Sequence, residues 1–333
     1  KDINNHTKTL CPSNIVAANH NSTINVRHYK PAVIELQHGA LCRNHFIKYF
    51  EEKVFSTIKK YHLINQNDKI GVACSGGKDS QTVLHLVKKY LVEENNQTKS
   101  LFALAIDEGI AGYRTKTLTD LKKFCRQEKV KLVIVSAKKE FGFTLDQAIK
   151  KLRKKDAKEK PCHICGVWRR YLINKYARKH GATKLITGHN LDDEAQAVVM
   201  NVFKANTALM SHQGPITGMH QNELFIQRVK PLYFCTEKET KLYSLLKNFP
   251  VGFVECPYAQ EGYRAQIRDM LNEFECKYRG TKQGIINSFL YMLPAVKAQE
   301  QKNVEDVIKL CTKCGEPGNQ QVCQACKIKE RLK

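Results

Sequence analysis

The sequence predicts an α/β protein whose core is a doubly wound parallel sheet. Three observations lead to this prediction: apolar strand segments alternate with helical segments, a glycine-rich turn joins the first strand to a helix, and a second polar strand-to-helix junction follows later in the chain. The chain has 333 residues, of which 42% are hydrophobic. This length suits a main α/β domain with smaller appendages.

The elements follow one another in the order that a parallel sheet with crossover helices requires. Apolar runs with strand character occupy residues 69–74, 101–106, 131–136 and 184–188. Segments with helical periodicity occupy residues 45–64, 79–93, 115–128, 143–157, 165–180, 191–205, 236–248, 261–276 and 282–298. The polar segment 206–222 contains glycine and proline and is predicted to be a mobile loop.

A glycine-rich loop joins the first strand to the helix after it. Its residues are Ser75, Gly76, Gly77, Lys78, Asp79 and Ser80. The two glycines allow several backbone N–H groups to point into one concavity, and the helix N-terminus and the lysine add positive charge. The loop therefore predicts a pyrophosphate-binding site. It differs from the Walker pattern, which has a longer spacer before its Gly-Lys pair.

A second strand-to-helix junction, residues 187–193, carries one glycine and two acidic residues. Gly188 permits close approach of a nucleotide to the backbone. Asp192 and Asp193 could cap the following helix, or one of them could hold Mg2+ or orient the reacting groups. Because parallel strands end on the same side of a sheet, this junction, the glycine loop and residues 106–109 should converge at one edge.

Three cysteines suggest a reactive centre. Cys162 and Cys165 stand at the start of a predicted helix and are followed by Arg169 and Arg170, so the pKa of both thiols is expected to be lowered. Cys256 is the third candidate. Three protein ligands would leave one metal position open, as in an iron–sulfur cluster, but a persulfide or disulfide relay fits the sequence nearly as well.

Four further cysteines near the C-terminus predict a structural zinc site. They form two Cys-x-x-Cys pairs separated by a turn-forming segment: Cys311, Cys314, Cys323 and Cys326. Four thiolates at this spacing can surround Zn2+ tetrahedrally, which closes the site and favours stability or RNA docking over catalysis. The use of cysteine for metal sites indicates a reducing compartment.

The charge balance favours a polyanionic partner. The chain has 55 Lys and Arg against 32 Asp and Glu, a formal net charge of +23, which makes nucleic acid the leading candidate. Residues 150–160 contain seven of these cations; they could form a solvated helix face, but contact with a nucleic-acid backbone is the preferred interpretation. No apolar run reaches the ~20 residues of a membrane span, and a cytoplasmic protein that does not bind membranes is expected.

Several motifs together resemble those of the PP-loop tRNA 2-thiouridine synthetases. This group contains the archaeal and eukaryotic wobble-uridine enzymes and the thermophile T-loop-uridine enzyme. The resemblance extends from about residue 25 to residue 328 and covers residues 41–46 (LCRNHF), 75–80 (SGGKDS), 162–170 (CHICGVWRR), 188–194 (GHNLDDE), 229–232 (VKPL), 255–258 (ECPY) and the C-terminal cysteine pairs.

The resemblance implies roles for individual residues. It implies that Cys162, Cys165 and Cys256 hold a 4Fe-4S cluster with one iron open, and that Asp193 is an essential acidic residue. Arg169 stands where the T-loop enzymes place a catalytic lysine; because arginine stays charged near neutral pH, phosphate stabilisation is assigned to it or to its neighbour. The residues implied around ATP are Ala73, Ser75, Gly76, Gly77, Lys78, Asp79, Ser80, Ile106, Arg170 and Gly188.

The N-terminal region departs from the family pattern. Relatives usually carry a Cys-x-x-Cys pair before the Lys-Pro-Ala-Val stretch, where this chain has Asn25 and His28. Cys42, His45 and His28 could supply three ligands of a second zinc. The expected organisation is a flexible extension (1–24), a finger-like segment (25–46), a linking helix (47–64), a PP-loop catalytic domain (65–300) and a zinc ribbon (306–333).

The predicted activity is ATP-dependent 2-thiolation of a tRNA uridine, in which uracil O2 is adenylated and then replaced by sulfur. The resemblance implies a ubiquitin-like thiocarboxylate protein or free sulfide as the sulfur donor, and a homodimer. Two alternatives stay open. One is another PP-loop tRNA-modifying ligase, which would not need the three cysteines. The other is a non-catalytic zinc-ribbon RNA-binding protein.

Overall fold

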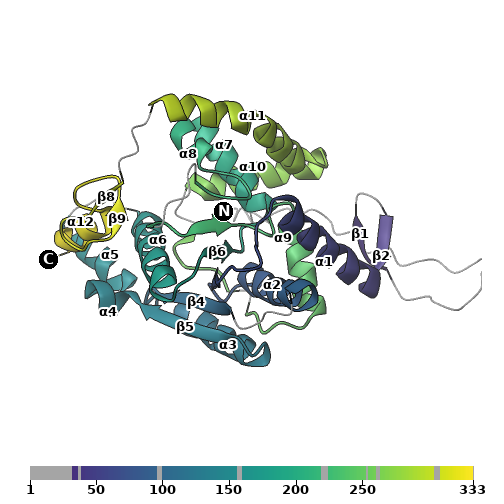
Figure 1. The fold of residues 1–333 in the computed structure, drawn as a ribbon, viewed down its shortest axis with the longest axis horizontal. Helices are drawn as coiled ribbons and strands as arrows, with labels where there is room; N and C mark the ends of the chain where they lie inside the picture. The colour runs from purple at the N-terminus through teal and green to yellow at the C-terminus, as the bar shows by residue number, and fades with distance from the viewer. Residues whose placement is uncertain are drawn as a thin grey trace, which may run out of the picture.

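A computed structural model describes eight parts of the chain: residues 32–36, 39–95, 100–155, 160–218, 224–252, 254–259, 263–303 and 308–332 (Figure 1). At the centre is a parallel sheet of five strands in the order β5-β4-β3-β6-β7. The strands are β3 (Ile70–Ala73), β4 (Leu101–Asp107), β5 (Lys131–Ser136), β6 (Lys184–Thr187) and β7 (Gln227–Val229). The predicted fold class is confirmed.

Strand β4 explains why the sheet is covered on both faces. It is apolar along almost its whole length and buried throughout its first six residues. Phe102, Leu104 and Ile106 face one hydrophobic core, whereas Ala103 and Ala105 face the other. Alternate residues of a strand point to opposite faces, so a continuous apolar run requires helices on both sides.

One layer contains α1 (Arg43–Lys60), α2 (Lys78–Asn95), α3 (Arg114–Gln127) and α9 (Glu237–Leu246). The opposite layer contains α4 (Ala137–Phe141), α5 (Leu145–Lys154) and α6 (Pro161–Lys179). The C-terminal ribbon, made of β8 (Lys309–Leu310), β9 (Pro317–Gly318) and α12 (Gln324–Arg331), packs beside this second layer (Figure 1).

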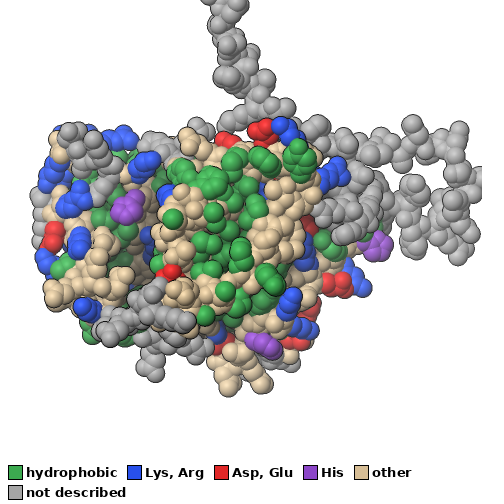
Figure 2. All heavy atoms as spheres, turned by 90° about the horizontal axis from the view of Figure 1, so that it is seen from above, with side chains coloured by type: hydrophobic (Ala, Val, Ile, Leu, Met, Phe, Trp, Pro, Cys, Tyr) green, Lys and Arg blue, Asp and Glu red, His purple; other side chains and the backbone are tan. Residues whose placement is uncertain are grey.

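A third group of helices packs at one end of the sheet. It consists of α7 (Leu191–Phe203), α8 (Thr207–Ser211), α10 (Tyr263–Lys277) and α11 (Thr281–Asn303). Figure 2 looks onto this end and shows apolar side chains gathered across it. Exposed large apolar residues of these helices are Val202, Phe203, Leu209, Phe274, Tyr291 and Met292, and Tyr278 directly follows α10. Within the described ranges, no helix combines the length and apolar character needed to cross a membrane.

Several boundaries differ from the sequence prediction. Helix α6 begins at Pro161, four residues before the predicted start at 165, because proline is well suited to the first helical position. The prediction of a loop over residues 206–222 is wrong for residues 207–211. These residues form helix α8, and Asn206 is its N-cap. The bounds of strand β7 could not be predicted, because three residues are too few to show a strand period. An N-terminal hairpin, β1 (Ala32–Leu36) and β2 (Gly39–Cys42), precedes α1.

Candidate active site

The glycine loop, residues 75–80, is held in one shape by its own serines. Gly76 has φ +87°, and a Cβ placed there would lie 2.3 Å from the carbonyl oxygen of Thr117. The Ser80 hydroxyl accepts from the Gly76 N–H at 3.2 Å and donates to the Gly77 carbonyl at 2.9 Å. The Ser75 hydroxyl accepts from the Gly77 N–H at 3.3 Å. The loop is therefore preorganised at the N-terminus of α2.

Lys78 lies between two carboxylates at the start of α2. Its Nζ is 3.1 Å from Asp79 Oδ2 and 2.8 Å from Glu237 Oε1, which comes from α9. Burial alone would lower the pKa of Lys78, but the two carboxylates raise it above its usual value. Lys78 therefore stays charged beside the loop, as phosphate binding requires.

The second junction packs directly against the glycine loop. A Cβ on Gly188 would lie 2.9 Å from the carbonyl carbon of Asp79, so only glycine permits this approach of the two backbones. Asn190 caps α7 and donates to Asp79 Oδ1 at 3.2 Å. The convergence of the two junctions, which the sequence predicted from the parallel strands, is thus present in the structure.

The two acidic residues of α7 have different surroundings. Asp193 belongs to the capping box of α7, and its Oδ1 pairs with Arg264 at 2.8 Å. Asn190 links it to Asp79, because the Asn190 backbone N–H donates to Asp193 Oδ2 at 3.3 Å and the Asn190 side chain donates to Asp79 Oδ1. Asp192 is buried, pairs with Lys282 and accepts from the Glu237 N–H at 2.7 Å. Asp193 therefore faces the site, whereas Asp192 joins α7 to α9 and α11.

The three cysteines of the predicted centre come together at the start of α6. Cys162 and Cys165 lie in its first two turns, and the Cys162 Sγ donates to the carbonyl oxygen of Tyr258 at 3.4 Å. Cys165, Cys256 and Tyr258 pack on the same hydrophobic core. Their sulfurs do not form a group within 4.8 Å of one another, unlike the four C-terminal cysteines. At least one pair of these three sulfurs is therefore more than 4.8 Å apart.

The predicted lowering of the pKa is wrong for the Cys165 thiol. Burial raises the pKa of Cys165 to about 12, and Glu108 adds to the rise. Burial also raises the pKa of Cys256. The sequence prediction counted the helix N-terminus and the arginines, but it could not include the desolvation that tertiary packing imposes.

A chain of ionic contacts joins the cysteines to the glycine loop. Arg169 contacts the Cys165 sulfur, and its Nε lies 3.4 Å from Glu108 Oε1. The other oxygen of Glu108 lies 2.9 Å from Arg114 Nε, and Arg114 donates through Nη1 to the Ser75 carbonyl oxygen. Glu108 is buried and follows β4. The Glu108 carboxylate therefore links helix α6, which carries Cys162 and Cys165, to the glycine loop.

More cations line the same edge of the sheet. Arg170 and Arg228 lie near enough that Arg170, together with burial, lowers the pKa of Arg228. His189 is kept neutral, because burial and the nearby cations lower its pKa to about 4. The two apolar residues predicted to contact ATP, Ala73 and Ile106, stand at the ends of β3 and β4 on this edge. The surroundings suit an anionic substrate.

The C-terminal cysteines form a compact four-sulfur group. Cys311, Cys314, Cys323 and Cys326 have ligand atoms within 4.8 Å of one another, so they could hold one metal ion. Arg178 of α6 pairs with Glu316 at 2.5 Å, which fixes the ribbon to the second helical layer. At the N-terminal side, Cys42 Sγ lies 3.2 Å from His45 Nδ1. The third predicted ligand, His28, lies outside the described residues.

The glycine loop and the five-stranded parallel sheet together are typical of nucleotide-binding α/β proteins. The family described as PP-loop domain matches residues 48–273. A tRNA-5-methyluridine(54) 2-sulfurtransferase from Pyrococcus horikoshii is 36% identical over 290 residues, 86% of this chain and 87% of that protein. The cytoplasmic tRNA 2-thiolation protein 1 of Aspergillus niger is 36% identical over 88% of this chain and 82% of that protein.

Among solved structures, the U34-tRNA thiolase NcsA from Methanococcus maripaludis with its 4Fe-4S cluster is similar, with a TM-score of 0.74 and 28% identity. The similarity covers 91% of this chain and 94% of that one. The chain belongs to the PP-loop family, in the branch of the tRNA 2-thiolation proteins.

Sequence analysis missed three site residues: Glu108, Arg114 and Glu237. For Glu108 a signal existed, because it directly follows a buried strand at the edge where ligands bind in such sheets. Glu237 and Arg114 gave no such signal. Each lies on a helix that reaches the glycine loop only through tertiary packing, which the sequence does not reveal.

Proposed function

We propose that the protein is an ATP-dependent tRNA-uridine 2-sulfurtransferase. One observation carries the proposal: Glu108 links the cysteine helix to the phosphate loop through Arg169 and Arg114. An enzyme that activates an oxygen with ATP and replaces it with sulfur needs both centres at one place. The names of the similar proteins support the transfer of sulfur to a tRNA uridine as the reaction.

The proposed nucleotide site lies at the loop edge of the sheet. The loop N–H groups, the α2 N-terminus and Lys78 would bind the β- and γ-phosphates, which leave as pyrophosphate. Asp79 and Asp193 are the proposed Mg2+ ligands, since Asn190 donates a hydrogen bond to each of these carboxylates beside the loop. The adenine would lie at the ends of β3 and β4, against Ala73 and Ile106, with Gly188 beside the phosphates.

Cys162, Cys165 and Cys256 are the residues that would hold a 4Fe-4S cluster. The number of thiols and the apolar packing around Cys165 and Cys256 fit such a group. A cluster with three protein ligands supplies an open iron position where sulfur can be held. A cysteine persulfide at the same residues is the alternative source of sulfur.

In the proposed reaction, uracil O2 attacks the α-phosphorus of ATP and pyrophosphate leaves. This step converts the uracil oxygen into part of a good leaving group. Sulfur then adds to C2, and the C2–O bond breaks to release AMP, which takes the former uracil oxygen. Lys78 and Arg169 would stabilise the negative charge that develops on the phosphates, with Arg170 beside them.

Other parts of the assembly are proposed from the family resemblance. The sulfur donor would be a ubiquitin-like thiocarboxylate protein or sulfide. A homodimer would use the apolar end formed by α7, α8, α10 and α11, whose exposed side chains are typical of an interaction surface (Figure 2). The four-cysteine ribbon would bind Zn2+, and Cys42 and His45 would contribute to a second zinc site.

The function is tested by incubating anaerobically prepared protein with unmodified tRNA, ATP and sulfide. AMP, pyrophosphate and 2-thiouridine should form in equal amounts, as measured by chromatography and nucleoside mass spectrometry. AMP formation with a different modified nucleoside would instead support a PP-loop ligase. Binding of tRNA without AMP formation would support a non-catalytic RNA-binding protein.

Replacing Glu108 with Gln should lower kcat for thiolation by roughly 10- to 100-fold, because the linked arginines lose their shared charge partner. The KM for ATP should change little, since the glycine loop keeps its serine contacts. Glu108→Asp should restore part of the rate. Glu140→Gln is the matched control: Glu140 also holds α6, through Lys175 and Tyr176, but away from the site. Equal losses in both variants would contradict a specific role for Glu108.

Replacing Cys326 with Ser should remove one zinc per chain, as measured by elemental analysis, while ATP binding stays unchanged. Loss of one thiolate opens a site that needs four ligands. Cys162→Ser serves as the reciprocal control and should lose iron but keep this zinc. Unchanged zinc in Cys326→Ser would show that the ribbon does not hold the metal.

A further inference from the structure

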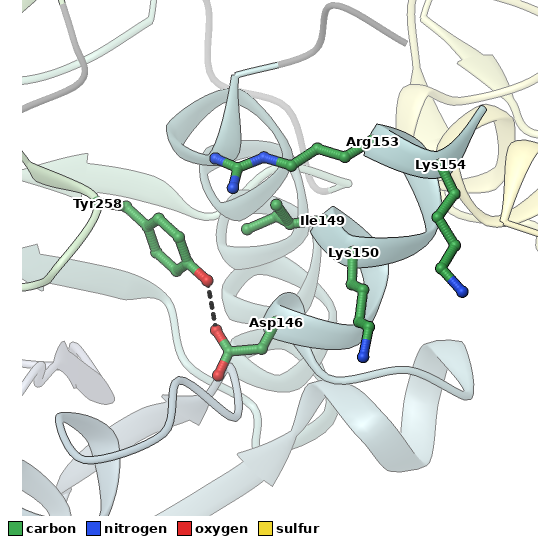
Figure 3. A pocket seen from close by; sticks show the side chains of 6 residues that line it. All are labelled: Asp146, Ile149, Lys150, Arg153, Lys154 and Tyr258. Atoms are coloured by element: carbon green, nitrogen blue, oxygen red, sulfur yellow. Dashed lines mark hydrogen bonds between the residues drawn. The ribbon is translucent and has the colours of Figure 1, made fainter. Parts of the chain in front are cut away.

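A cavity of about 420 Å³ lies beside the three cysteines, outside the proposed ATP site (Figure 3). Its lining residues are Asp146, Ile149, Lys150, Arg153, Lys154 and Tyr258. Five of these come from one face of α5, because residues three and four apart share a helix face. Tyr258 forms the opposite wall (Figure 3).

The charge of this cavity is strongly positive. Asp146 is the single carboxylate of the lining, and both of its oxygens are engaged: Oδ1 accepts from the Tyr258 hydroxyl at 2.7 Å and Oδ2 from the Ala111 N–H at 2.8 Å. The lining also has three cationic side chains, Lys150, Arg153 and Lys154, which outnumber this carboxylate. The cavity therefore combines positive charge with an aromatic wall and the buried apolar side chain of Ile149.

The cavity is physically connected to the cysteine centre and to the ribbon. Tyr258 is two residues from Cys256, and its carbonyl oxygen accepts from the Cys162 Sγ at 3.4 Å. On the other side, Lys155 at the end of α5 donates to the Arg331 carbonyl of α12 at 3.0 Å. An extended ligand could therefore run from the cysteine centre over α5 to the ribbon.

We propose that this cavity binds one nucleotide of the tRNA, near but distinct from the target uridine. The phosphate would contact Lys150 and Lys154, and the sugar or base would pack on Tyr258 and Ile149. Cations together with an aromatic surface are the combination that binds single-stranded nucleic acid, and the volume suits a small ligand. This inference rests on the proposed function, and it adds a second place on the protein where the tRNA substrate binds.

The test measures binding of a full-length unmodified tRNA transcript to the full chain over a range of salt concentrations. The double variant Lys150→Ala/Lys154→Ala should weaken binding roughly five- to tenfold and lower the salt slope by about one per lost phosphate contact. The control Lys122→Ala/Lys123→Ala removes the same charge from exposed positions on α3, which covers the opposite face of the sheet. It should leave the slope unchanged.

A second pair of variants separates stacking from charge. Tyr258→Phe keeps the ring and should retain tRNA affinity, although it loses the bond to Asp146. Tyr258→Leu keeps an apolar side chain without a ring and should bind several-fold more weakly. The iron content of both variants is measured, and affinities are compared only at equal iron content. A weaker affinity then cannot come from damage to the neighbouring cysteines.

The outcomes distinguish this inference from the proposed function. If the unaltered protein neither binds nor thiolates tRNA, the proposed function fails. If it does both and the α5 double variant matches the α3 control in affinity and salt slope, the nucleotide site is overturned. Unchanged tRNA binding with a raised KM for a protein sulfur donor would also overturn it and assign the cavity to the donor.

Discussion

Replacing Cys162 with Ala is expected to abolish 2-thiolation while ATP binding persists. The cysteine lies in the first turn of α6, where it contacts the Tyr258 carbonyl and completes the three-sulfur centre. Loss of one ligand should release the iron and remove the place where sulfur is held. The rate of 2-thiouridine formation should fall at least roughly a thousandfold, as for loss of a reacting group. Nucleoside mass spectrometry measures the rate, and iron and sulfide analysis measures the cluster.

The control for Cys162→Ala is Cys125→Ala. Cys125 is also a cysteine of a helix, but it is buried in α3 on the opposite face of the sheet. The Cys125→Ala variant should keep its iron and its activity. It should lose only a little stability, because a buried sulfur atom is removed. Full thiolation activity in Cys162→Ala would contradict the assigned role. Loss of iron with retained activity would show that sulfide attacks C2 of the adenylated uracil without the cluster.

Replacing Gly76 with Ala should weaken ATP binding by more than roughly a hundredfold. The new Cβ would lie 2.3 Å from the Thr117 carbonyl oxygen, which is backbone, so the glycine loop itself must move. A displaced loop no longer aims its N–H groups at the phosphates, and a shift of about 1 Å in a binding site costs such a factor. Isothermal titration with ATP measures the effect.

The matched control for Gly76→Ala is Gly112→Ala. Gly112 also has a positive φ, +71°, but an added Cβ there meets nothing within 4 Å. Both variants therefore share the conformational cost of about 1–2 kcal/mol, and Gly76→Ala alone has the clash. Gly112→Ala should bind ATP normally. Equal ATP affinities for the two variants would show that the loop shape is not what binds the nucleotide.

Much of the fold was predictable because it depends on local pattern. The apolar run of β4 and the glycine loop after β3 predict a parallel sheet with two strand-to-helix junctions meeting at one edge. The structure has this sheet and this meeting of the two junctions. The same logic placed the Cys162 and Cys165 pair at a helix start. The bounds of strand β7 could not be predicted, because it has only three residues and its register is set by pairing with β6.

The site was less predictable because its electrostatics depend on tertiary contacts. The raised pKa of Cys165 comes from burial against elements far away in the sequence. Lys78 was predicted as a phosphate ligand, but its partner Glu237 lies 159 residues further along the chain. Glu108 contacts two arginines on different helices, which no spacing rule indicates.

The most direct test of the central claim follows the uracil oxygen. A tRNA whose uridines carry 18O at O2 is incubated with anaerobically prepared protein, ATP and sulfide. If O2 is adenylated and then displaced by sulfur, the released AMP carries the label in proportion to the 2-thiouridine formed. If 2-thiouridine forms while AMP stays unlabelled, ATP is not used to activate the uracil oxygen, and the proposed mechanism is wrong.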